Sequence, residues 1–100
     1  MDEDNVTALH LAAWKGKEAV AAQLLQARAS VTAVNNGGST PLHYAADNGK
    51  AQVVDLLLQA KASPTAVAKD GRTPARVAEQ CGHHDLAARL RQAEQAPSSM

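Results

Sequence analysis

The sequence predicts an all-α repeat solenoid, in which three helix–turn–helix units stack side by side. A similar motif returns every 33 residues, starting at Thr7, Thr40 and Thr73. A glycine follows nine residues after each of these threonines, at Gly16, Gly49 and Gly82. The chain of 100 residues, long enough for one small domain, keeps this register without an insertion.

Each unit is expected to begin with a short helix. Threonine is a favoured N-cap, and Pro41 and Pro74 follow it at the first helical position, where proline costs no hydrogen bond. The glycine then suits a left-handed C-cap. Such a helix has only about two turns and is not stable alone in water, so it needs its neighbours.

A second helix is predicted from about residue 50 to residue 60. It carries an apolar stripe at i, i+1, i+4 and i+5, formed by Val53, Val54, Leu57 and Leu58. This pattern is typical of a helix face buried against a neighbour. Residues 20–25 align with this segment in unit one.

Turn residues separate the units. Residues 35–38 are Asn-Asn-Gly-Gly and residues 69–72 are Lys-Asp-Gly-Arg. Asn-Gly and Asp-Gly pairs accept the positive φ of tight turns. Val34 and Val67 suit short extended arms before these turns.

The motif T-P-L-H-x-A-A, the glycine, the segment V-V-x-L-L-L and the turn, at a 33-residue period, resemble the ankyrin repeat. The resemblance is strong in unit two, good in unit one and degenerate in unit three. It implies repeats at about residues 4–36, 37–69 and 70–94. These form a domain of residues 1–94, and residues 95–100 have the composition of a disordered tail. It also implies antiparallel helix pairs with β-hairpin fingers projecting at right angles.

Unit three departs from the motif in a way that indicates the end of the stack. Charged residues replace apolar ones, and Arg76, Glu79, Arg89 and Arg91 are expected to form a polar cap. The alternative is a basic binding patch of the three arginines. We expect local pairing of Arg89 with Asp85 and of Arg76 with Glu79.

Unit one keeps its apolar residues, including Leu9, Leu11 and Leu24, although only six residues precede it. Its open face is interpreted either as an N-terminal cap or as the sign of a chain cut from a longer protein. An exposed apolar face also favours weak self-association of an otherwise monomeric chain.

Composition narrows the classes of partner. Ten basic and ten acidic residues give a formal charge of zero, which does not favour nucleic acid or an anionic membrane. The chain has one cysteine and an acidic N-terminus unlike a signal peptide, so we expect an intracellular, cytoplasmic or nuclear location.

No residue pattern favours catalysis, a cofactor or a metal. His10 and His43 lack further ligands at suitable spacing, and the resemblance implies that each binds its threonine and the backbone of the neighbouring turn. Residues 83–84 are interpreted as a solvated helix start. Cys81 is expected to be an inert, half-exposed thiol, because it follows a helix end that does not lower a thiol pKa.

The resemblance implies that a partner protein binds to the fingers and to the concave face of the first helices. The predicted contact residues are Trp14, Lys15, Asn36, Ser39, Tyr44, Asp47, Asn48, Lys69, Asp70 and Arg72. The only two aromatic residues of the chain, Trp14 and Tyr44, are among them, and both types are enriched in binding hot spots. The alternative is that these two rings serve repeat packing. Asp4 and Val6 occupy the corresponding finger of unit one.

We therefore predict a non-enzymatic protein-interaction module for an unidentified partner protein. The alternative is a regulatory or targeting segment of a larger enzyme or multidomain protein. A resemblance in fold does not name the partner.

Overall fold

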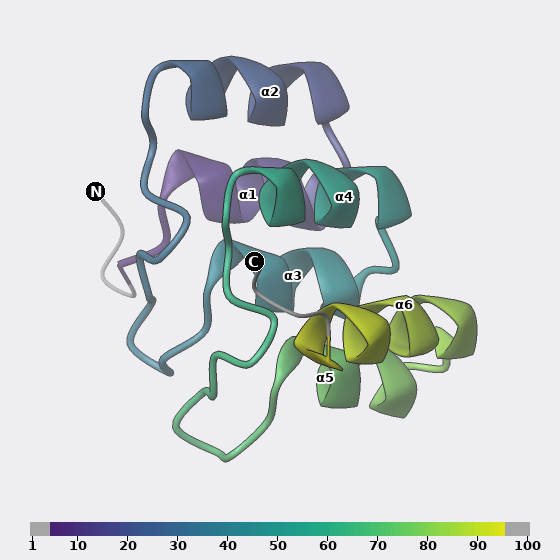
Figure 1. The fold of residues 1–100 in the computed structure, drawn as a ribbon. Coiled ribbons are helices and arrows are strands. Elements are labelled where there is room, and N and C mark those ends of the chain that lie inside the picture. Colours follow the sequence, from purple (N-terminus) through teal and green to yellow (C-terminus); the bar gives the residue numbers. More distant parts are fainter. Residues whose placement is uncertain (1–4, 96–100) are drawn as a thin grey trace.

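The computed structural model describes residues 5–95, which form six helices in two layers (Figure 1). The inner layer contains α1 (Ala8–Lys15), α3 (Pro41–Asp47) and α5 (Pro74–Gln80). The outer layer contains α2 (Glu18–Gln26), α4 (Ala51–Gln59) and α6 (His84–Gln95). Each inner helix packs against the outer helix of its own unit, and α3 packs between α1 and α5. The predicted stack of three helix pairs is confirmed.

The local signals of the sequence set the helix ends. The threonines before α1, α3 and α5 accept a hydrogen bond from the backbone N–H three residues later. In α1 and α3 a histidine side chain completes a capping box. Gly16 and Gly49 then take positive φ values of 71° and 68° at the helix ends. The second helix of unit two, predicted from about residue 50 to 60, runs over Ala51–Gln59.

The core is built from alanine and branched aliphatic residues. Ala45, Ala46, Leu42, Val54 and Leu57 have no exposed surface. Small side chains allow the inner helices to approach closely, and the leucines and valines fill the space between the layers. Neither aromatic residue belongs to the fully buried core.

The fingers are tight loops without regular strands anywhere in residues 5–95. In the first, the backbone N–H of Asn35 donates to the carbonyl of Ser39; in the second, that of Ala68 donates to Arg72. The N–H of Lys69 donates to the Gly37 carbonyl at 2.9 Å and joins the two fingers. The loops therefore reverse like hairpins, but their arms are too short to form a β-ladder.

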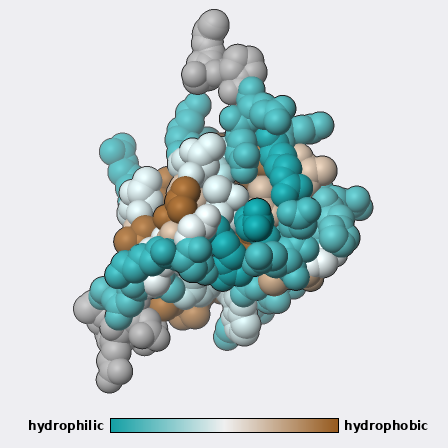
Figure 2. Space-filling view, turned by 90° about the horizontal axis from the view of Figure 1, so that it is seen from below, coloured by the Kyte–Doolittle hydropathy of each residue, from teal (hydrophilic) through white to brown (hydrophobic). Residues whose placement is uncertain are grey.

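The two ends of the stack differ. In unit one, Leu11 and Val20 are 44% and 46% exposed, whereas Val77 and Val53, at the same positions of later units, are 5% and 1% exposed. These positions face the preceding unit, so unit one leaves them uncovered. Seen from below, the side of α5 and α6, the surface is mainly hydrophilic (Figure 2).

The ion pairs of unit three correct the expected local pairing. Arg89 pairs with Asp55 of α4 at 2.6 Å, and Arg91 pairs with Glu79 of α5 at 2.5 Å. Arg89 thus reaches across to the neighbouring unit instead of along its own helix to Asp85. The Arg91 guanidinium lowers the pKa of Glu79. These paired charges support the interpretation of unit three as a cap.

The ends of the chain lie partly outside this description. Gln95, the first residue of the expected tail, is the last residue of α6. The expected disorder of residues 96–100 and the finger position of Asp4 fall outside the described residues. Among residues 5–95, no helix is both long and apolar enough to cross a bilayer.

Candidate partner-binding groove

In each of the first two units, one histidine binds the finger that follows the unit. His10 Nε2 lies 2.9 Å from the carbonyl oxygen of Ser39, and His43 Nε2 lies 2.9 Å from that of Arg72. On the other side of each ring, Nδ1 accepts the backbone N–H of the capping threonine. Nε2 is therefore the protonated nitrogen and donates to the carbonyl. The expected structural role of both histidines is confirmed, and these bonds hold the fingers beside the inner helices.

Between the fingers and the inner helices lies a hollow of about 280 Å³, called the groove below. It is lined by five of the predicted contact residues: Trp14, Ser39, Tyr44, Asp47 and Arg72. Asn35, His43 and Val77 complete the lining. The structure thus brings residues of all three units to one concave surface.

The two aromatic residues that line the groove differ in their contacts and exposure. Tyr44 is half-buried: its hydroxyl accepts a hydrogen bond from Asn35 Nδ2 at 2.8 Å, and its ring meets the His10 ring edge-on, with centroids 4.9 Å apart. Trp14 keeps 42% of its surface exposed. Packing therefore explains the position of Tyr44 well, whereas the Trp14 ring remains open to solvent.

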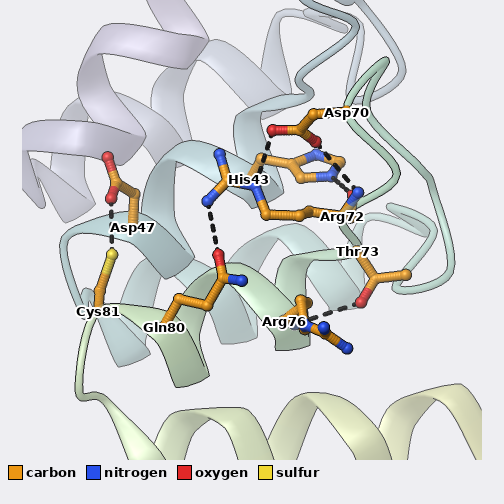
Figure 3. A network of polar contacts seen from close by, with 8 residues as sticks. All are labelled: His43, Asp47, Asp70, Arg72, Thr73, Arg76, Gln80 and Cys81. Atoms are coloured by element: carbon orange, nitrogen blue, oxygen red, sulfur yellow. Dashed lines mark hydrogen bonds and ion pairs between the residues drawn. The ribbon is translucent and has the colours of Figure 1, made fainter.

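Asp47 is the acidic residue of the groove (Figure 3). Its Oδ1 accepts the Cys81 thiol at 3.0 Å, and its backbone oxygen lies 3.1 Å from His83 Nε2. Both contacts come from the following unit. The hydrogen bond to the Asp47 carboxylate raises the pKa of the Cys81 thiol, because it favours the protonated form. This agrees with the expectation of an inert thiol.

Arg72 is the basic residue of the groove and is held from two sides (Figure 3). Its Nε donates to Asp70 Oδ2 at 2.8 Å, and its Nη1 donates to Gln80 Oε1 at 2.9 Å. The Arg72 backbone N–H, assisted by its guanidinium, lowers the pKa of Asp70. The guanidinium is therefore fixed between the second finger and α5.

The family comparison agrees with this architecture. Residues 9–98 match the family described as ankyrin repeats (3 copies). The chain belongs to the ankyrin repeat family. A search of curated proteins finds no match to this ankyrin repeat chain. Ankyrin repeats are generally protein–protein interaction modules and are generally non-catalytic.

The other five predicted contact residues of this ankyrin repeat domain lie outside the groove lining. Asn48 donates from Nδ2 to the Trp14 carbonyl at 2.7 Å, and Asp70 holds Arg72. Asn36 accepts a hydrogen bond from Asn5 at 2.8 Å. The remaining two, both exposed, are Lys15 at the end of α1 and Lys69 in the second finger.

Three residues of the groove lining, Asn35, His43 and Val77, are absent from the predicted contacts, and Asn35 makes several of the contacts that shape the groove. Its Oδ1 accepts the backbone N–H groups of Gly37 and Ser39, while its Nδ2 reaches Tyr44. The signal was the Asn-Asn-Gly-Gly run, since asparagine before a turn commonly binds the backbone two residues on. That run gives no indication that the amide also orients the tyrosine.

The described part of the chain offers no evident metal centre. In residues 5–95, no group of three or more His, Cys, Asp or Glu side chains could hold a metal ion. The surface that the structure offers is a shallow groove with one open indole, one carboxylate and one guanidinium already in contact with its neighbours.

Proposed function

We propose that this ankyrin repeat domain is a non-enzymatic module that binds a partner protein through the groove and the fingers. The observation that carries the proposal is the open Trp14 ring at the rim of a concave, polar groove. Exposed tryptophan is costly to leave in water, and tryptophan beside a polar rim is typical of interaction hot spots. The contact residues predicted from the sequence remain proposals within this surface.

The test begins by finding the partner. A photo-crosslinking amino acid placed at position 14 should capture in cells a protein that the same group at the exposed position Gln92 of α6 does not capture. With that protein purified, Trp14→Ala should weaken its Kd by about ten-fold or more, since a hot-spot side chain is worth at least about 1.4 kcal/mol. Gln92→Ala should leave the Kd unchanged.

Stability provides the control for Trp14→Ala. The bond from Asn48 goes to the Trp14 backbone oxygen, which alanine retains. We therefore expect helix content and melting temperature to stay near those of the wild type. An unchanged Kd in a folded Trp14→Ala variant would remove Trp14 from the interface.

We also propose that the chain is a monomer that self-associates weakly through the face of unit one. Leu11 and Val20 are exposed there, whereas Arg91 and Glu79 make the opposite end polar. Two copies would therefore meet through the same face. Sedimentation at rising concentration should show association that Leu11→Asp abolishes, and a concentration-independent coefficient would contradict it.

The alternative, a regulatory or targeting segment of a larger protein, uses the same surface and differs only in what the module is attached to. The predicted intracellular location, based on the single cysteine, stays a prediction.

A further inference from the structure

The charge that the groove offers to a partner is negative. Of its two charged lining residues, Arg72 already pairs with Asp70 and donates to Gln80. Asp47 belongs to none of the ion pairs found within residues 5–95. Within those residues, the Asp47 carboxylate accepts one hydrogen bond, which comes from the neutral thiol of Cys81. The Asp47 carboxylate therefore accepts a hydrogen bond but makes no ion pair within the described residues.

Lys15 does not change this balance. It occupies the repeat position of Asn48 and Cys81, and both of these side chains reach back to the preceding unit. Lys15 itself is exposed at the end of α1 and does not line the groove.

The shape and chemistry of the groove suit one long cationic side chain. Its volume of about 280 Å³ lies just below the range of about 300–1,000 Å³ that is usual for small-molecule pockets. An indole face attracts guanidinium and ammonium groups, and a carboxylate on the same surface adds a direct partner. Trp14 and Asp47 hold equivalent positions on neighbouring units, so both face this concave surface.

We propose that the groove binds an arginine or lysine side chain of the partner protein, with the cation against Trp14 and paired with Asp47. This inference rests on the proposed function, because it names the chemistry of the partner at the same surface. Each of the two contacts is partly exposed to solvent. We therefore expect each to contribute only about a two- to five-fold change in Kd.

The test uses blocked tripeptides as probes of the full chain at low salt, where screening is weak. Acetyl-Gly-Arg-Gly-amide should shift the NMR signal of the indole N–H, which is unique because the chain has one tryptophan. The shift should saturate in the millimolar range, whereas acetyl-Gly-Glu-Gly-amide should cause none. A missing or unsaturable shift with the arginine peptide, or an equal shift with the glutamate peptide, would overturn the proposal.

Asp47→Asn is the decisive variant, and Asp85→Asn is its matched control. Asparagine keeps the Oδ1 acceptor for the Cys81 thiol, so the fold should be retained. Asp85 is exposed on α6 and its substitution changes the net charge equally. Asp47→Asn should raise the Kd of the arginine peptide about two- to five-fold, and Asp85→Asn should not. Equal effects of the two would show a nonspecific charge effect and refute the assignment.

The Kd of the captured partner for the two variants distinguishes a failure of this inference from a failure of the proposed function. If Trp14→Ala weakens partner binding but Asp47→Asn does not, the interaction surface stands and the basic side chain is refuted. If neither variant weakens binding, both the surface and its chemistry are wrong. If both do, a charge-reversing change of one partner arginine or lysine should be rescued by Asp47→Lys.

Discussion

Replacing His43 with glutamine should separate its role in helix capping from its role in binding the next unit. The histidine caps its own helix through Thr40 and binds the next unit through the Arg72 carbonyl. Glutamine at this helix position can still reach back to the N–H of the cap, as in an ordinary capping box. It has no second ring nitrogen to donate across to Arg72.

The expected loss follows from these contacts. His43 is 3% exposed, and its Nε2 lies 2.9 Å from the Arg72 oxygen. The Arg72 carbonyl still accepts the backbone N–H of Ala68, so His43→Gln removes one hydrogen bond and should lower the free energy of unfolding by about 0.5–1.5 kcal/mol. His43→Ala also removes the bond from the Thr40 N–H to the His43 ring, which adds about 0.5–1.5 kcal/mol. The total free energy of unfolding of a small domain is only about 5–15 kcal/mol, so the loss in either variant is easily measured.

Urea denaturation followed by circular dichroism at pH 7 measures both variants. Arg76→Gln is the matched control, because Arg76 holds the same repeat position but is exposed and has no later unit to bind among residues 5–95. It should change the stability by less than about 0.5 kcal/mol. If His43→Gln cost no more than Arg76→Gln, the bond to Arg72 would contribute nothing to the stacking of units two and three.

Two further predictions concern stability. Burial lowers the pKa of His10 and His43 below the usual 6.5, so the unfolded chain binds protons that the folded chain excludes. Stability should be constant above about pH 7 and fall below pH 6.5 by up to about 1.4 kcal/mol per pH unit for each histidine; equal urea midpoints at pH 7.5 and 5.5 would contradict this. Lys61 has a φ of 74°, which strains a residue with a Cβ. Lys61→Gly should therefore raise the free energy of unfolding by about 0.5–1 kcal/mol, whereas a lowered melting temperature would show that the strain is negligible.

Much of the fold could be predicted because its signals are local. A threonine cap, a proline at the first position and a glycine stop act within one helix turn, and they mark α3 and α5. The bounds of α4 were predicted to within one residue at each end from its apolar stripe. The positive φ values of Arg28 and Lys61, just after the outer helices, were not predicted, because no glycine marks these turns. The partner of Arg89 was also missed, because Asp55 lies 34 residues away on the neighbouring unit.

The sequence by itself determined the 33-residue period and the helix caps, because identical positions repeat the same short-range chemistry. The resemblance to the family then implied the structural role of the two histidines. Only the tertiary structure decided which side chains share the groove and which charges are already paired. A repeat position states where a residue sits in its unit, but not which neighbour it reaches. Asp70 and Gln80 hold the Arg72 guanidinium, whereas the Asp47 carboxylate accepts the Cys81 thiol of the next unit, and these contacts are visible only in the folded chain.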